Sequence, residues 1–500
     1  MENFKSKLDN FFQITERGST VKTEIVGGLT TFFAMCYIMM VNPAYMTQTF
    51  DGGIMNMSLF NAVFIATAIG AIVGTLLMAL YAKMPFAQAP GMGLNSFFWV
   101  AFMIPVVFAT ADEQAAAFGM GLSVIFLSGI VFLILSVTGA RKAIVKSMPD
   151  CLKKAIPAGI GLFIAFIGFK NAGIVQANQY TFVQLGNIAV FDKSQFLITN
   201  EVGEVIGRMA SADIWYLISP IFVAFIGFLL IAILSHYKVK GSVIVSILVS
   251  TGLFYLFNIG NAEAFTPFKN MQNVGQSFID FGQFGIGAAF KGFGELPKHY
   301  VGFAGFLSVL MLVITFCLVD MFDTLGTLQG TATEAGMLDD EGNPKRLNQC
   351  LMCDSVASVV GAVAGTSTVT TYVESATGVS AGARTGLASV VTAGCFFIAM
   401  FLSPVAAIIP SAATAPALIW VGVLMLKNFK AVDMENFRSA VPAFLTLIVM
   451  PLSYSISNGI AVGMISYTVL TLLAGKFGKK DIIVAVLGAL FLVRFLCVYM

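Results

Sequence analysis

Charged residues are scarce in this chain, and their scarcity excludes a water-soluble domain of useful size. Asp, Glu, Lys and Arg make up 11% of the 500 residues, whereas hydrophobic residues make up 58% and the mean hydropathy is +0.88. The net charge of +2 gives no sign of a nucleic-acid partner. Apolar runs of about 18–25 residues, long enough to cross a bilayer core of ~30 Å, recur from end to end. The composition therefore predicts an all-α polytopic membrane protein.

The chain also lacks the residue patterns of metal sites and secretory leaders. Among its seven Cys residues, only Cys350 and Cys353 form a CxxC pair, with no second pair and no His nearby. We therefore expect free thiols or apolar fillers, no metal and no cofactor. The first 22 residues are polar and of mixed charge, so we expect no cleavable signal peptide.

What is present is a series of apolar segments whose second half repeats the first. Residues 69–75 resemble 360–366, residues 121–129 resemble 386–394, and residues 156–171 resemble 409–428, in the same order. We predict 14 membrane spans, at 25–46, 60–82, 87–105, 117–138, 153–170, 213–235, 241–258, 301–325, 348–365, 368–383, 386–404, 413–427, 437–454 and 457–475. Seven spans per half is an odd number, so the second repeat should be inverted relative to the first.

The positions of Lys and Arg orient this arrangement. With the amino terminus inside, 21 of them fall in inner segments and six in outer segments, and Arg494 is unassigned. We expect a cytoplasmic-membrane protein with both termini in the cytoplasm and long outer loops near 171–212 and 259–300. The expected divisions are a cytoplasmic tail at 1–24, the first repeat at 25–258, an extracytoplasmic loop at 259–300, the second repeat at 301–475, and a tail at 476–500 with a terminal or interfacial helix.

Two short polar tracts interrupt spans 3 and 10, at corresponding places in the two halves. Residues 88–96 (QAPGMGLNS) are rich in Gly and Pro, and residues 366–375 (TSTVTTYVES) are rich in Thr and lack a helical period. Broken helices are tolerated in lipid only where the freed backbone is buried or lines a cavity, and a matched pair is typical of a transporter's binding site. We predict one short strand in each tract, the two strands paired, and half-helices that begin near Asn95 and Tyr372.

Three carboxylates, Asp320, Asp323 and Glu374, fall inside predicted spans with no Lys or Arg available to pair with them. An ionisable group at mid-bilayer costs about 2.5–3.5 kcal/mol, so it is a functional hypothesis by default. Asp320 and Asp323 share one helix face, and Glu374 starts a half-helix whose free N–H groups favour acceptors or anions. The alternative is neutral acids in a helix–helix seam. For Asp354, close to the inner end of its span, we expect a wetted helix end.

These groups indicate the chemistry of a ligand. Carboxylates, the Asn95 amide and free backbone N–H groups offer donors and acceptors, but not the Arg or Lys that a phosphate, sulfate or carboxylate would need. A planar heterocycle with N–H donors and ring-nitrogen acceptors fits better, although Asn95 is equally explained as a helix cap. Five aromatic residues are near enough in sequence to stack on such a ring: Phe86, Phe97, Phe98, Phe322 and Tyr372.

Five segments resemble one known family. They are GLTTFFAMCYIMMVNPA (28–44), APGMGLNSFF (89–98), LVDMFDTLGTL (318–328), GTSTVTTYVESATGVSAGARTGL (365–387) and ATAPALIWVGVLM (413–425). Over residues 24–475 the chain resembles the nucleobase:cation symporters related to the nucleobase–ascorbate transporters, specifically the adenine/guanine/hypoxanthine permease branch. The resemblance implies a core domain and a gate domain built from two intertwined seven-helix inverted repeats. It also implies substrate contacts at Asn95, Asp320, Asp323 and Glu374.

Two departures from the uracil and xanthine branches of that family bear on specificity. The residue before the glutamate is Val373 where Gly is common, and Asp320 replaces a common glutamate. Both departures fit a purine site better than a uracil site. We therefore expect substrate contacts at Gly93, Asn95, Asp320, Tyr372, Val373 and Glu374, and cation coupling at Asp323 and Asp320.

The combined prediction is a purine nucleobase uptake permease for adenine, guanine and/or hypoxanthine, driven by a coupled cation, with H⁺ favoured over Na⁺. Its expected partners are the base, the cation and the lipid bilayer, with a homodimer left open and no enzymatic activity. A rival with the same fold is an anion transporter or channel of the sulfate-permease type, which should carry a basic or neutral residue in place of Glu374. A rival of another class is an intramembrane aspartyl protease, but Asp320 and Asp323 on one helix are poorly placed to flank a scissile bond.

Overall fold

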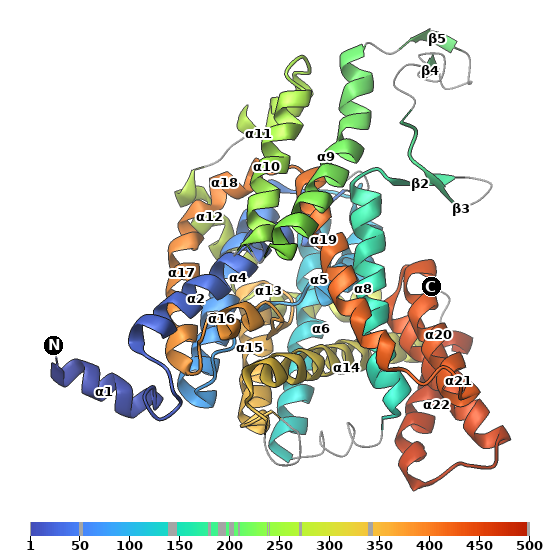
Figure 1. Ribbon diagram of the computed structural model, residues 1–500. Helices are drawn as coiled ribbons and strands as arrows, with labels where there is room; N and C mark the ends of the chain where they lie inside the picture. The colour runs from blue at the N-terminus through green and yellow to red at the C-terminus, as the bar shows by residue number, and fades with distance from the viewer. Residues whose placement is uncertain are drawn as a thin grey trace.

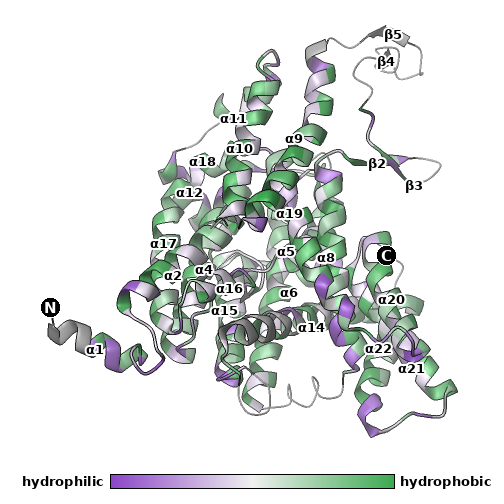
Figure 2. Ribbon diagram, viewed as in Figure 1, coloured by the Kyte–Doolittle hydropathy of each residue, from purple (hydrophilic) through white to green (hydrophobic). Residues whose placement is uncertain are grey.

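The computed structural model describes residues 2–49, 54–138, 148–178, 182–188, 197–199, 205–208, 211–237, 239, 241–269, 273–338 and 344–497. Within these ranges the chain is mostly helical (Figure 1), and ten helices are long and apolar enough to cross a membrane. Apolar residues dominate these helices and hydrophilic residues gather towards their ends (Figure 2). The expectation of a polytopic helical membrane protein is confirmed. The count of 14 segments and their inversion remain predictions.

The first half of the chain runs from α1 to α10. Its helices are α1 (Glu2–Phe12), α2 (Val21–Met35), α3 (Ile38–Met46), α4 (Met57–Leu77), α5 (Met92–Phe98), α6 (Ala111–Thr138), α8 (Asp150–Asn171), α9 (Ser211–His236) and α10 (Ser242–Phe257). Strand β1 (Gln88–Pro90) precedes α5, and two separate hairpins, β2 (Val175–Asn178) with β3 (Phe182–Leu185) and β4 (Leu197–Thr199) with β5 (Val205–Arg208), precede α9. Figure 1 shows these hairpins extending from one end of the helical body.

The second half runs from α11 to α22. Its helices are α11 (Thr266–Lys269), α12 (Val274–Asp280), α13 (Ala288–His299), α14 (Gly302–Ala335), α15 (Leu347–Ala364), α16 (Ser375–Ser380), α17 (Gly386–Ala399), α18 (Ser403–Ala407), α19 (Ser411–Leu426), α20 (Phe437–Leu452), α21 (Ile456–Leu473) and α22 (Ile482–Cys497). Strand β6 (Val369–Thr371) precedes α16.

Most of the helices fall into two packed groups. In one group α4, α6, α13, α15 and α17 pack on one another, and in the other α8 packs against α19 and α20, with α9, α10 and α21 alongside. Small residues allow close approach between α8 and α19, because Gly161 lies against Gly422 and Gly168 lies against Ala415. These pairs also show that α8 and α19 run antiparallel. The strand-bearing segments and α14 lie between the groups.

The segment at 259–300 differs from the expected loop. Two of its helices, α12 and α13, pack against α4 and α6 respectively. Gly119 and Gly292 meet at that contact so closely that a Cβ on Gly292 would lie 2.0 Å from the Gly119 carbonyl oxygen. Glycine at this crossing therefore lets α13 pack as part of the helical body. Much of the other expected loop, including Lys193, lies outside the described residues.

The C-terminal helix α22 packs against α21 and α14 and is not a free interfacial segment. Arg494 is buried and donates from Nη1 to the Ser457 hydroxyl at 3.1 Å, while Asp481 accepts from the Tyr467 hydroxyl at 2.9 Å. These contacts make α22 antiparallel to α21. The last described turn of α22 therefore lies beside the start of α21.

Candidate functional site

The two interrupted tracts meet at the centre of the molecule. Strand β1 pairs antiparallel with β6, with Gln88 opposite Thr371 and Pro90 opposite Val369, and every residue of both strands is buried. The pairing continues at one end, where the Gly91 N–H donates to the Thr368 carbonyl at 3.0 Å. Short helices α5 and α16 follow the strands. The prediction that the two tracts form paired strands followed by short helices is confirmed, but α5 begins at Met92 and α16 at Ser375, each three residues from the expected start.

Glycines of the repeated motif make room for this strand pair. Gly70 and Gly74 of α4 and Gly361 of α15 all face the Val369 side chain, and a Cβ on any of them would lie within 3.0 Å of a Val369 methyl. The motif at 69–75 and its counterpart at 360–366 therefore hold β6 from two sides. Their likeness in sequence reflects a shared packing role.

A central cavity of about 230 Å³ lies beside the strand pair, bounded by α8, α14 and α19. This volume is below the range of about 300–1,000 Å³ typical of drug-sized ligands, so the cavity suits a small molecule. Five of the expected site residues line it: Gly93, Asp323, Tyr372, Val373 and Glu374. Asn95 and Asp320 are not among its lining residues.

Glu374 is held by a residue whose role the sequence did not reveal. The Tyr37 hydroxyl donates to Glu374 Oε1 at 2.6 Å, and Tyr37 is completely buried. Tyr37 occupies the short break between α2 and α3, 337 positions away from its partner. It belongs to the conspicuous segment 28–44, but nothing in that segment names Glu374 as its partner. The carboxylate is thus oriented by a neutral donor.

Asp323 and Glu374 line the same cavity without a basic partner. The ion pairs found within the described ranges join Asp150 to Lys153 and Glu295 to Lys298, and neither involves a cavity residue. One cation, Lys427 at the end of α19, also lines the cavity, which the placement of Lys and Arg at span ends did not anticipate.

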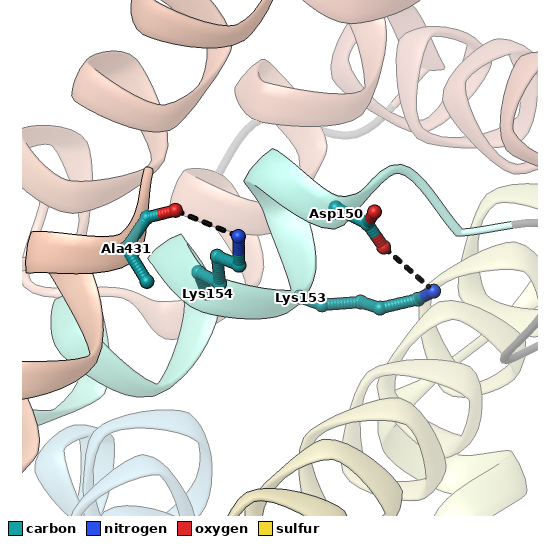
Figure 3. A network of polar contacts seen from close by, with 4 residues as sticks. All are labelled: Asp150, Lys153, Lys154 and Ala431. Carbon is teal, nitrogen blue, oxygen red and sulfur yellow. Dashed lines mark hydrogen bonds and ion pairs between the residues drawn. The ribbon is translucent and has the colours of Figure 1, made fainter. Parts of the chain in front are cut away.

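The short segment that begins at Lys427 is hydrogen-bonded to the start of α8. Figure 3 shows the Lys154 ammonium donating to the Ala431 carbonyl at 2.6 Å, beside the Asp150–Lys153 pair at 3.1 Å. Ala431 ends the short 3₁₀ helix Lys427–Ala431 that follows α19. The contact ties the α8 and α19 ends that flank this side of the cavity.

Asp320 and Asn95 lie close to the strand pair but outside the cavity wall. Asp320 Oδ2 accepts a hydrogen bond of 2.8 Å from Ser358, whose hydroxyl also contacts the Val369 carbonyl at 3.1 Å. The Ser367 hydroxyl contacts Asn95 Oδ1, and Asn95 Nδ2 is buried with no hydrogen-bond partner among the described residues. Asn95 therefore retains a donor and does not cap a helix.

Asp354 is not at a wetted helix end, so that expectation is wrong. Its side chain is completely buried, where Oδ1 accepts from Gln88 Nε2 at 3.1 Å and Oδ2 accepts from the Thr324 hydroxyl at 2.5 Å. The Thr324 hydroxyl also lies 2.7 Å from that of Thr370. Asp354 thus joins α14 and α15 to both strands, through partners far away in sequence.

The expected aromatic stacking is mostly not available in this cavity. Tyr372 is the one member of the five that lines it, and its hydroxyl donates to the Pro90 carbonyl at 2.5 Å. Phe97 instead packs on Phe316 and Phe98 on Phe118. The side chain of Phe322 lies outside the described residues.

Comparisons with known proteins agree with the family and the fold class expected from the sequence. The model of the Permease family matches residues 22–199 and 195–462. The guanine/hypoxanthine permease PbuG of Bacillus subtilis is 36% identical over 98% of this chain and 99% of its own length. The adenine permease AdeP of Escherichia coli is 34% identical over 97% of this chain and 95% of its own. The solved transmembrane domain of the cyanobacterium bicarbonate transporter BicA aligns with a TM-score of 0.53 at 14% identity, covering 87% of this chain and 97% of that one, which shows a shared fold alone.

Proposed function

The chain belongs to this Permease family, among the nucleobase–ascorbate transporters, and on that premise we propose that it is a purine nucleobase uptake permease of the cell membrane. The observation that carries the proposal is a small cavity with two unpaired carboxylates, Asp323 and Glu374, beside the paired strands. Carboxylates accept hydrogen bonds from N–H groups, which purine bases present around their rings. The relatives named for guanine, hypoxanthine and adenine support the same substrate class.

Glu374 is the proposed main contact to the base. Tyr37 occupies one of its oxygens, so the carboxylate can accept further hydrogen bonds from a base in the cavity. The backbone N–H groups of the half-helix starts, at Gly93 and Val373, would supply donors to ring nitrogens, whereas the Tyr372 N–H already donates to the Ala87 carbonyl at 3.0 Å. Asn95 has a spare amide donor but lies outside the cavity wall, so it would reach the base only after a rearrangement of α5.

Asp320 and Asp323 are proposed to act as one unit in cation coupling. Two neighbouring acids cannot both ionise cheaply in a low dielectric, so the pair would hold a proton that it gains on one side of the membrane and releases on the other. Asp323 lines the cavity and Asp320 is buried beyond it, so direct contact with the base is better supported for Asp323 than for Asp320. The sequence-based expectation had placed Asp320 among the substrate contacts and Asp323 with the coupling cation.

The proposed frame is the inverted repeat with a core domain and a gate domain. The two packed groups of helices support such a division, with the α8–α19–α20–α21 group as the gate. We propose a cytoplasmic amino terminus. Because α22 runs back along α21, we place the carboxyl terminus on the opposite side.

The decisive experiment is uptake of radiolabelled adenine, guanine, hypoxanthine and uracil into permease-deficient cells, with wild-type protein and with Glu374→Gln. Losing a charge-assisted hydrogen bond of about 1.5–3 kcal/mol should weaken apparent affinity roughly 10- to 150-fold. Glu295→Gln, the same change at a glutamate that pairs with Lys298 outside the cavity, is the matched control. Normal uptake kinetics in Glu374→Gln, at equal membrane expression, would refute the assignment of Glu374 as the main contact to the base. Absence of purine uptake by the wild-type protein would refute the proposed function.

The cavity gives little support to the alternative function of an anion transporter. Lys427 is the one cationic side chain among the lining residues, and the two carboxylates oppose the binding of an anion. Competition of purine uptake by sulfate or bicarbonate would favour that rival.

A further inference from the structure

A second cavity, of about 1050 Å³, lies at the other end of α8. It is lined by residues of three helix ends: Phe166, Lys170 and Asn171 of α8, Tyr216 of α9, and Phe254 and Tyr255 of α10. Aromatic rings and an amide thus face one space, a composition common to sites that bind flat, partly polar molecules.

The two cavities share the same pair of helices. Pro157 and Ile164 of α8 line the central cavity, whereas the second cavity begins at Phe166. On the antiparallel partner α19, Val421 lines the central cavity and Ser411 the second. The cavities therefore lie end to end along α8 and α19, as two binding sites on one transport path would.

A cluster of aromatic rings packs on α8 where the lining of the central cavity ends and that of the second cavity begins. Tyr454, between α20 and α21, packs against Phe163 at 5.5 Å, Phe166 at 6.0 Å and Trp99 at 6.5 Å between ring centroids. Phe163 and Trp99 are completely buried. Phe163 and Phe166 belong to α8, whereas Trp99 follows α5 in the strand-bearing segments between the groups, so a movement of α8 and α20 relative to those segments would part Trp99 from Tyr454.

An amide pair with unused hydrogen-bonding groups lies beside Trp99 of this cluster. Asn171 Nδ2 donates to Gln48 Oε1 at 3.0 Å, and the Gln48 backbone carbonyl accepts from the Trp99 indole at 2.8 Å. Asn171 Oδ1 and Gln48 Nε2 are both buried and have no hydrogen-bond partner among the described residues. Asn171 lines the second cavity and Gln48 does not, so the Asn171 carbonyl is the group that an N–H of a nucleobase could reach there, and amide side chains read bases in other contexts.

We propose that the second cavity is a binding site of its own for a planar, nitrogen-rich heterocycle, which stacks on the aromatic side chains of the lining, Phe166, Tyr216 and Phe254, and hydrogen-bonds to the Asn171 amide. The identity of the heterocycle as a purine rests on the proposed function. The site receives the base on the side opposite the central cavity, so one chain holds two bases when both sites are full.

Equilibrium binding of radiolabelled hypoxanthine, guanine and adenine to the purified full-length protein tests this inference. The wild type should bind two equivalents of a transported base per chain, and Glu374→Gln should retain one. Tyr216→Ala should weaken the remaining site about 5- to 100-fold, the range expected for losing one base–aromatic stack. Asn171→Leu should weaken it as well, with gel-filtration behaviour reporting on folding.

Trp215→Ala is the matched control. Trp215 neighbours Tyr216 on α9, is 40% exposed and does not line the cavity, so its removal should leave both sites intact. One equivalent in a wild-type protein that transports purines would overturn the second site and leave the proposed function standing. Loss of all binding in Glu374→Gln, or equal behaviour of Tyr216→Ala and Trp215→Ala, would overturn it too. Absence of purine uptake would instead refute the proposed function.

Discussion

Replacing Gly74 by Ala tests whether close packing around β6 maintains the site. Gly74 lies in α4, and an added Cβ would meet Gln88 Oε1 at 2.8 Å, Val369 Cγ1 at 2.9 Å and Gln88 Cβ at 3.0 Å. Gln88 cannot move aside freely, because its backbone N–H and side-chain amide are hydrogen-bonded to Thr75 and Asp354. Either α4 or the strand pair must shift.

The expected destabilisation follows from two opposing effects. Forcing a methyl group into a filled core costs about 1–3 kcal/mol. Ala in place of Gly within a helix recovers roughly 0.5–1 kcal/mol through lower backbone entropy in the unfolded chain. Gly394→Ala in α17 is a control in which only the second effect operates, since no atom lies within 4 Å of its added Cβ. The difference between the two variants should therefore equal the overpacking cost, about 1–3 kcal/mol.

The assay is reversible unfolding of both purified variants in the same mixed micelles, followed by uptake kinetics in cells. Gly74→Ala should have a lower free energy of unfolding than the wild type and a weaker apparent affinity, because β6 leads directly into Tyr372 and Glu374. Gly394→Ala should be at least as stable as the wild type. Equal stability of the two variants would refute the close-packing argument.

Three further outcomes are expected. Impermeant maleimide should label cysteines placed at Lys193 and Lys269 on intact cells, and a C-terminal epitope should be reached from the same side; protection of both cysteines would mean that the inverted repeat is misplaced. A protonophore should abolish purine accumulation by the wild type, and dependence on a sodium gradient instead would turn the Asp320–Asp323 pair into a candidate Na⁺ site. Hydrogen bonds from the Thr15 backbone and hydroxyl to Asp9 lower the pKa of that carboxyl, so this turn after α1 should be stabilised at neutral pH and weaken below about pH 4; carboxyl NMR shifts, assigned with Asp9→Asn, would contradict this by showing an ordinary midpoint.

Local patterns in the sequence were sufficient for the class of protein and for the interrupted segments. Apolar runs must match the bilayer thickness, so their length predicts spans without reference to other parts of the chain. Gly, Pro and Thr make residues 88–96 and 366–375 poor helix formers wherever they lie, and their matched places in the repeat indicated that they pair. The buried carboxylates stood out because an unpaired charge in a span is costly.

Tertiary structure alone decided which of these groups face the same space. The partners of Glu374 and Asp354 lie 337 and 266 positions away, at Tyr37 and Gln88, so no local pattern could name them. Asp320 and Asp323 share a helix face, yet Asp320 accepts a hydrogen bond from Ser358 beside the strands and Asp323 lines the cavity. One face of a long helix contacts more than one neighbouring element, so a shared face does not place two side chains in the same site. Sequence determines what each segment can form, whereas the packing of segments that are distant in sequence determines which side chains meet.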